Sequence, residues 1–289
     1  MLARAAAVVR EAVSPGSTLR RPLGHTRRGS MMAYRRATST ARMLPTFLEI
    51  AAQQSGTTSL HEYLGEHPHV GRPTTKEIHY FTHNSFRSLA WYRARFPRAG
   101  RFTHAFESTP YTLFHPCCPG RVQAALPEVK LVVLLRDPVD RAHSHYNHQV
   151  ATGCEALEFE AALSCEAQRL AGEEERLRDD PRYSSFAHQH YSYLARGMYA
   201  EQLERWYACF AAERLLVLAA EELFAQPART VHRVQSWLGL PEHTPSTLVA
   251  RNARRYGSMD PQLRTRLRTL FAADAGRLRG LTGVQMPWA

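Results

Sequence analysis

The chain has 289 residues, of which 44% are hydrophobic and 22% charged, and its formal net charge is +11. A chain of this length can bury one large hydrophobic core or two modest ones. It contains no uncharged apolar run of about 18 residues, so we do not expect it to span a membrane. Residues 1–9 are interrupted by Arg4 and are too short for a secretory signal, so secretion is not expected either.

Most of the positive charge lies near the amino terminus. Residues 1–43 contain nine arginines and one acidic residue, Glu11, and contribute +8, whereas the remainder contributes +3. We therefore expect residues 1–43 to be a basic, disordered extension and residues 44–289 to form a single α/β domain. Such an acid-poor leader is also typical of organelle transit peptides, and it could bind a polyanion. The body of the protein is not expected to bind nucleic acid.

The cysteines and histidines do not indicate a metal centre. The five cysteines are odd in number and lack CxxC spacing, and the adjacent Cys117 and Cys118 are poorly placed to bridge each other. We therefore expect a reducing, cytoplasmic location. On a helix, His143 and His145 would point about 200° apart, so they are not expected to share a metal ion.

Two strand–loop–helix units are predicted in the first half of the chain. Residues 45–51 are β-like, residues 53–59 form a loop, and helical spacing resumes at Leu60. Residues 130–136 predict a strand that is buried on both faces, and Asp137-Pro138 then starts a helix. Two such units indicate a parallel sheet.

Further elements follow from hydrophobic spacing. Residues 88–96 predict a helix, and residues 106–114 predict a short strand that enters a turn at Pro110. The later part of the chain predicts helices over 155–175, 198–210 and 227–238, the last ended by Gly239, with a strand over 214–219.

The first of these loops has the composition of an anion-binding loop. Ser55-Gly56-Thr57-Thr58 would present backbone N–H and hydroxyl groups to an anion at the positive end of a helix dipole. By itself the loop is also compatible with an ordinary N-cap. Thr57 occupies the position of the Walker A lysine, which argues against an ATP or GTP hydrolase and against a small-molecule kinase.

Several separated motifs resemble those of the sulfotransferases that use 3′-phosphoadenosine 5′-phosphosulfate (PAPS), especially the heparan-type glucosaminyl branch and its soluble bacterial relatives. Residues 51–60 are similar to the family's phosphosulfate loop, residues 76–81 (Lys-Glu-Ile-His-Tyr-Phe) to its acceptor-side segment, and residues 136–146 to its 3′-phosphate motif. Shorter similarities occur at 91–97, 196–199, 237–241 and 252–256.

The resemblance implies a P-loop-type parallel sheet flanked by helices, with PAPS as sulfuryl donor, adenosine 3′,5′-bisphosphate as product, and no metal. The residues implied to bind the nucleotide are Gln53, Gln54, Ser55, Gly56, Thr57, Thr58, Ser59, Arg136, Ser144, Arg254 and Arg255. Physical chemistry agrees at Arg136, because a guanidinium at the carboxyl end of a strand can hold a phosphate with two hydrogen bonds. The alternative for Arg136 is an ion pair with Asp137 or Asp140.

The implied catalytic residues are Lys76, Glu77 and His79. Glu77 would take the proton of the acceptor hydroxyl, and the alternative for it is a surface carboxylate that Lys76 neutralises. In an extended segment His79 would face the same side as Glu77 and could orient the base or the acceptor. The alternative for His79 is packing within an aromatic cluster.

One position departs from the family pattern. Gln54 stands where the family has a lysine that stabilises the departing phosphate oxygen, and a neutral amide lacks that charge. Lys76 or Arg72 is the expected substitute cation. The predicted function is sulfuryl transfer to a hydroxyl or amine of a carbohydrate or small-molecule acceptor. The alternative is a catalytically silent relative that binds a nucleotide or a glycan.

Overall fold

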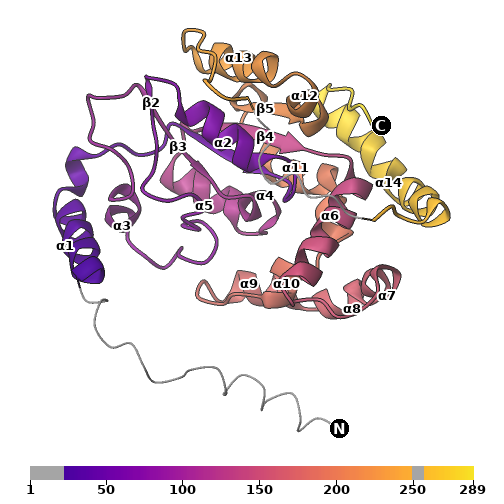
Figure 1. Cartoon of the computed structure of the whole chain (residues 1–289). Helices are drawn as coiled ribbons and strands as arrows, with labels where there is room; N and C mark the ends of the chain where they lie inside the picture. The colour runs from indigo at the N-terminus through magenta and orange to yellow at the C-terminus, as the bar shows by residue number, and fades with distance from the viewer. Residues whose placement is uncertain (1–22, 249–256) are drawn as a thin grey trace, which may run out of the picture.

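Five parallel strands form the central sheet of the computed structural model, which describes residues 23–248 and 257–289 (Figure 1). The strand order is β2-β3-β1-β4-β5, and each neighbouring pair runs parallel. The strands are β1 (Phe47–Ala51), β2 (Val70–Gly71), β3 (His104–Ser108), β4 (Lys130–Leu135) and β5 (Leu215–Ala219). The predicted α/β fold with a parallel sheet is confirmed.

β1 and β4 lie side by side at the centre of the sheet. Their register pairs Phe47 with Lys130 and Ala51 with Leu134, so both strands end at the same edge. The chain leaves β1 towards β2 and β3 on one side, whereas it leaves β4 towards β5 on the other. The gap between the loops that follow β1 and β4 is therefore the switch point at which open α/β sheets bind ligands.

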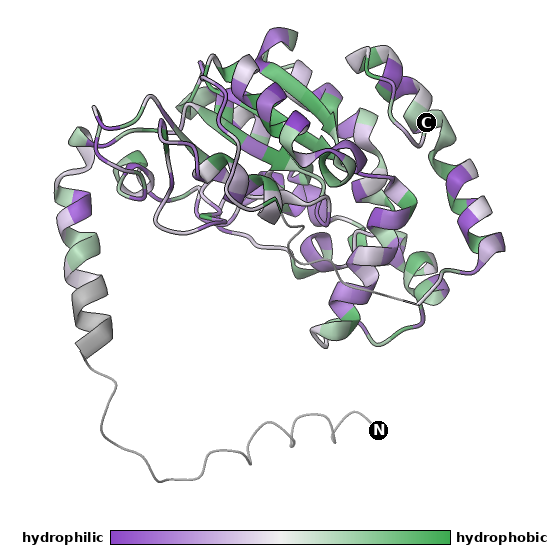
Figure 2. Ribbon diagram, turned by 45° about the horizontal axis from the view of Figure 1, so that its top comes forward, coloured by the Kyte–Doolittle hydropathy of each residue, from purple (hydrophilic) through white to green (hydrophobic). Residues whose placement is uncertain are grey.

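Helices cover both faces of the sheet, and the hydrophobic residues of the strands lie between them (Figure 2). One face packs against α2 (Thr57–Gly65), α12 (Ala220–Ala225) and α13 (Pro227–Leu238). The other face packs against α3 (Leu89–Arg93), α4 (Tyr111–Phe114), α5 (Cys118–Ala125), α11 (Tyr199–Tyr207) and α14 (Pro261–Thr282). Among the described residues, no helix is long and apolar enough to cross a bilayer.

A smaller helical group lies beside the sheet and has its own core with α14 (Figure 1). It consists of α6 (Pro138–Ala151), α7 (Phe159–Ser164), α8 (Glu166–Leu170), α9 (Glu173–Asp179) and α10 (Phe186–His190). The helix predicted over 155–175 is therefore divided, and Gly172 separates α8 from α9 with a φ of 74°. A left-handed residue cannot continue a helix, which accounts for this break.

Local signals placed several element ends correctly. The Asp137 carboxylate accepts hydrogen bonds from the N–H groups of Val139 and Asp140 and caps α6. α13 ends before Gly239, which has a φ of 78°. Ser88 caps α3, which is shorter than the predicted helix over 88–96.

The amino-terminal segment differs from its prediction. Residues 23–37 form α1 (Leu23–Ala37) instead of a disordered extension. Arg35 donates hydrogen bonds to the carbonyl groups of Ala94 (2.7 Å) and Phe96 (2.6 Å), and the buried Arg42 also donates to Phe96 (3.2 Å). These arginine contacts hold the segment on the body of the protein, which composition alone did not reveal. Residues 1–22 lie outside the described part of the chain.

Candidate nucleotide and acceptor site

The loop between β1 and α2 is the centre of the site. Gly56 has a φ of 89°, and a Cβ there would lie 2.7 Å from the Phe224 ring, so the position requires glycine. The backbone N–H groups of Gln54, Gly56 and Thr57 have no hydrogen-bond acceptor among the described residues. Donors at the start of a helix bind anions. The loop therefore has the donors that the predicted phosphosulfate site requires.

The hydroxyl groups of the loop have different partners. Ser55 is fully buried and donates to the Leu134 carbonyl at 3.1 Å, which ties the loop to β4. Thr57 and Ser59 are buried in the first turn of α2. Thr58 accepts a hydrogen bond of 2.8 Å from Lys76 Nζ. Ser55 thus maintains the shape of the loop, and Thr58 connects the loop to a cation.

Arg136 follows β4 and reaches across to the loop, where its Nη1 donates to the Gln54 carbonyl at 2.8 Å. Neither acid proposed as its alternative partner is available. Asp137 caps α6, and Asp140 forms an ion pair of 2.7 Å with Arg264. The alternative that Arg136 serves an ion pair with these residues is wrong, and its guanidinium is placed to bind a ligand phosphate.

Gln54 occupies a strained position between Arg136 and α6. Its φ is 72°, in the left-handed region that residues other than glycine rarely adopt. Its side-chain Oε1 lies 3.5 Å from the Ser144 hydroxyl. Ser144, two turns into α6, is therefore brought to the same loop as Arg136, as the sequence predicted.

The three predicted catalytic residues lie together beside the loop. Lys76 Nζ is 3.6 Å from Glu77 Oε1, and His79 Nε2 is 3.6 Å from Glu77 Oε2. The Glu77 side chain is 45% exposed, so an acceptor can reach it. The nearby His79 ring and the charge of Lys76 lower the pKa of Glu77, which keeps the carboxylate ionised at neutral pH, the form in which it can act as a base.

The backbone that carries Glu77 and His79 is not extended, contrary to the prediction. Both residues have a φ of 55° and are left-handed. The two side chains meet because of this backbone shape, and the end of β3 supports it. The Glu77 N–H donates to the Ser108 carbonyl at 3.1 Å, and the neighbouring Glu107 is buried with hydrogen bonds from Tyr92 and Thr109. Residues in sparsely populated conformations persist only where surrounding contacts hold them.

Arg72 does not reach the loop. Its guanidinium donates to the Glu62 carboxylate at 2.8 Å and to the Gly65 carbonyl at 2.8 Å, which is the carboxyl end of α2. The loop lies at the opposite end of that helix. Of the two substitute cations proposed for the missing loop lysine, only Lys76 contacts the loop.

Sequence reasoning missed one charged group of the site. Arg196 is only 3% exposed, and its Nη1 donates to the Gln53 Oε1 at 2.6 Å. Burial lowers the pKa of Arg196 to about 9. Three residues further on, the Tyr199 hydroxyl donates to the Arg136 carbonyl at 2.8 Å. The sequence signal was the Arg-Gly-Met-Tyr similarity at 196–199, which connects both residues to the nucleotide site.

Two predicted nucleotide ligands, Arg254 and Arg255, lie outside the described residues. The part of the chain that is described contains no cluster of three or more His, Cys, Asp or Glu side chains that could hold a metal ion. The His145 ring is buried against Tyr193, whereas the His143 ring contacts Phe159.

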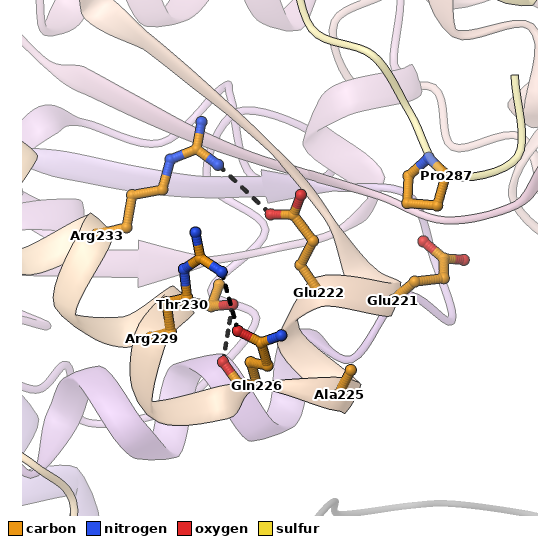
Figure 3. Close-up of a pocket in the computed structure, with 8 residues that line it drawn as sticks. All are labelled: Glu221, Glu222, Ala225, Gln226, Arg229, Thr230, Arg233 and Pro287. Carbon is orange, nitrogen blue, oxygen red and sulfur yellow. Dashed lines mark hydrogen bonds and ion pairs between the residues drawn. The ribbon is translucent and has the colours of Figure 1, made fainter.

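A separate cavity of about 500 Å³ lies beside α12 and α13 (Figure 3). The arginines that line it already have partners within the lining, because Arg233 forms an ion pair with Glu222 at 3.4 Å and Arg229 donates a hydrogen bond to Gln226. It includes none of the loop residues 53–59. The predicted site is therefore defined by the loop and its cations and not by this cavity.

The comparison with known proteins agrees with this geometry. Residues 45–255 match the family model of the sulfotransferase domain. Heparan sulfate glucosamine 3-O-sulfotransferase 3B1 of Mus musculus is 32% identical over 200 residues, which are 69% of this chain and 47% of that protein. Bifunctional heparan sulfate N-deacetylase/N-sulfotransferase 3 of Homo sapiens is 31% identical over 208 residues, which are 69% of this chain and 23% of that protein.

A solved structure extends the match over more of the chain. The sulfotransferase from Alicyclobacillus acidocaldarius has a TM-score of 0.68 and 30% identity, and the match covers 85% of this chain and 99% of that one. The chain belongs to the sulfotransferase family, and the predicted resemblance is confirmed. It spans about half the length of the 3-O-sulfotransferases that it matches.

Proposed function

We propose that this protein transfers the sulfuryl group of PAPS to a hydroxyl or amine of a carbohydrate acceptor. The observation that carries the proposal is the meeting of Lys76 and Arg136 at one anion-binding loop, with the Glu77 carboxylate 3.6 Å from the lysine. Membership of the sulfotransferase family supports the reaction. The 32% identity with a heparan sulfate glucosamine sulfotransferase supports a carbohydrate acceptor.

The nucleotide would lie across the switch point of the sheet. Arg136 and Ser144 would hold the 3′-phosphate, and the N–H groups of residues 54–57 would hold the 5′-phosphosulfate. The exposed Phe224 ring lies 6.0 Å from the Arg136 guanidinium and offers a flat apolar face for the adenine. Bound PAPS supplies an activated sulfuryl group, whose bond to the 5′-phosphate oxygen breaks as the acceptor oxygen or nitrogen bonds to sulfur.

Glu77 takes the proton that the acceptor loses, and His79 holds the carboxylate in place. Lys76 lies between this base and the loop hydroxyl of Thr58, so its charge can stabilise the phosphate oxygen that keeps the electron pair of the broken bond. Lys76 thus performs the task for which Gln54 lacks a charge. We also infer a cytoplasmic location, because the five cysteines are odd in number and lack CxxC spacing.

The proposal is tested with isotopically labelled PAPS and a panel of heparan-type oligosaccharides. Mass spectrometry should detect an acceptor that has gained one labelled sulfuryl group, and Glu77→Gln should abolish this product while adenosine 3′,5′-bisphosphate still binds. Binding of the nucleotide without product from any acceptor would instead favour the silent relative. No binding of the nucleotide at all would overturn the assignment of the site.

A further inference from the structure

Two segments that lack acidic residues pack together at one edge of the molecule. Residues 23–48 contain five arginines and no aspartate or glutamate, and residues 78–106 have the same composition. In the sequence they are separated by 29 residues that include Glu49, Glu62, Glu66 and Glu77. Figure 1 shows α1 and α3, which belong to these two segments, side by side.

Hydrogen bonds fix this arrangement. Besides the bonds from Arg35 and Arg42 to the end of α3, Arg98 donates to the Tyr34 hydroxyl at 2.6 Å. From residue 29 onwards, no arginine of either segment takes part in an ion pair with another described residue. Burial and the charges of Arg36 and Arg87 lower the pKa of Arg95, so these cations repel one another. A bound polyanion would relieve that repulsion.

The face contains a groove of about 310 Å³. It is lined by Arg36, Phe86, Arg87, Ser88, Ala90 and Trp91. Arg36 comes from α1, so the groove exists only because α1 is docked. The aromatic rings of the groove form cation–π contacts with arginines. The Arg95 guanidinium lies 4.3 Å from the Trp91 ring centre, and the Arg87 guanidinium lies 5.1 Å from the Phe86 ring centre.

The groove lies next to the segment that carries Glu77 and His79. Tyr80 follows His79, its ring stacks on Tyr92 at 4.2 Å, and it lies 6.3 Å from the Trp91 ring. The Tyr80 hydroxyl also donates to the Arg87 carbonyl at 3.3 Å. The buried Tyr80 ring therefore joins the segment that carries Glu77 and His79 to the wall of the groove, and an acceptor chain whose reacting group lies at Glu77 would extend along the surface towards Arg87 and Arg36.

We propose that the groove formed by α1 and residues 86–91 binds the extended part of an anionic polysaccharide acceptor, and this inference rests on the proposed function. Sulfate and carboxylate groups on such a chain are bidentate partners for guanidinium groups. Single-stranded nucleic acid would need open aromatic faces for base stacking. Here Arg87 and Arg95 lie over the Trp91 ring, which leaves little stacking surface beside the half-exposed Phe86 ring and favours the polysaccharide.

The test compares the full chain with the exposed double variant Arg36→Ala/Arg87→Ala. Binding of a fluorescent heparan sulfate oligosaccharide is measured by anisotropy at two salt concentrations, and the Kd for adenosine 3′,5′-bisphosphate is measured in parallel. We expect the oligosaccharide Kd to rise about tenfold, which equals about 1.4 kcal/mol. The salt dependence of binding should weaken, because fewer counterions are exchanged. The nucleotide Kd and the melting temperature should not change.

Two matched variants complete the design. Arg36→Lys/Arg87→Lys should recover only part of the affinity, because it restores charge without the bidentate geometry. Arg229→Ala/Arg233→Ala removes the same charge from α13 and should leave oligosaccharide binding unchanged. Unchanged binding in the groove variant, or equally tight binding of a single-stranded DNA of similar length, would overturn this inference alone. Loss of nucleotide binding by the unmodified chain would overturn the proposed function alone.

Discussion

The Arg196 Nη1 donates a 2.6 Å hydrogen bond to the Gln53 Oε1, although the two residues lie 143 positions apart in the sequence. The same guanidinium donates to the His188 and Gln189 carbonyl groups, and it lies 4.9 Å from the Tyr111 ring centre. Because its oxygen accepts from Arg196, the Gln53 amide presents its NH₂ donor elsewhere in the site. A buried cation therefore orients the first residue of the anion-binding loop.

We predict that Arg196 and Gln53 act as one unit in nucleotide binding. Gln53→Ala and Arg196→Lys should each weaken the binding of adenosine 3′,5′-bisphosphate. The double variant should lose much less binding free energy than the sum of the two single losses. The coupling free energy should be about 1–2 kcal/mol in a double-mutant cycle measured by calorimetry. Fully additive effects would contradict this link. Melting curves serve as the control, because Arg196 also supports buried carbonyl groups.

Arg136→Ala should weaken the binding of adenosine 3′,5′-bisphosphate by roughly 1.5–3 kcal/mol, the loss expected for a charge-assisted phosphate contact. The reason is that Arg136 reaches the loop and has no carboxylate partner within ion-pair distance among the described residues. Glu77→Gln is the matched control and should leave the affinity unchanged. If Arg136→Ala binds the nucleotide as tightly as the native chain, the phosphate lies elsewhere.

Lys76→Ala should lower kcat on the order of 10²-fold, because it removes the cation beside the departing phosphate oxygen. Adding Gln54→Lys to that variant should restore at least part of the rate, since it places an ammonium on the loop itself. In the native background the same substitution should change kcat little, because Lys76 already supplies the charge. Failure of Gln54→Lys to rescue Lys76→Ala would show that the two positions do not serve the same oxygen.

His79 should control the acid limb of the pH–rate profile. The His79 ring, 3.6 Å from the Glu77 carboxylate, is the largest cause of the lowered pKa of Glu77, followed among the lowering effects by the charge of Lys76. Activity should therefore fall as Glu77 gains a proton, at a lower pH than an unperturbed carboxyl group would give. His79→Ala should move this limb to higher pH. An unmoved limb would mean that a different group is the base.

Glu49 should make the protein less stable as the pH rises. It is fully buried in β1, and neither of its carboxylate oxygens has a hydrogen-bond partner among the described residues. Burial raises the pKa of Glu49 from 4.5 to about 8. The folded chain therefore keeps a proton that the unfolded chain releases above pH 4.5, so stability falls between these two values as the pH increases.

Glu49→Gln should remove most of this pH dependence and stabilise the protein by about 2 kcal/mol at pH 8, with a smaller effect at pH 5. Urea denaturation at the two pH values measures the difference. A variant whose stability still falls between pH 5 and pH 8 as steeply as that of the native chain would assign the dependence to other groups.

The sequence determined the local features of this protein. Apolar residues 131–135 specify a strand buried on both faces, Asp137 can reach the first N–H groups of the helix that follows it, and Gly56 and Gly239 permit left-handed turns. Each of these outcomes depends on atoms within a few residues of one another. The predicted nucleotide site rests on the resemblance of the loop and of residues 136–146 to the family's motifs. The structure brings the loop and Arg136 together, because parallel strands end at a common edge.

Only the tertiary structure decided which distant side chains meet. Whether Lys76 or Arg72 contacts the loop depended on which end of α2 each one reaches, and Arg72 is held by Glu62 at the far end. From the sequence, the positively charged amino-terminal segment is predicted to be a separate, disordered extension. The carbonyl groups at the end of α3 bind Arg35 and Arg42, and this contact joins two acid-free segments into one charged face.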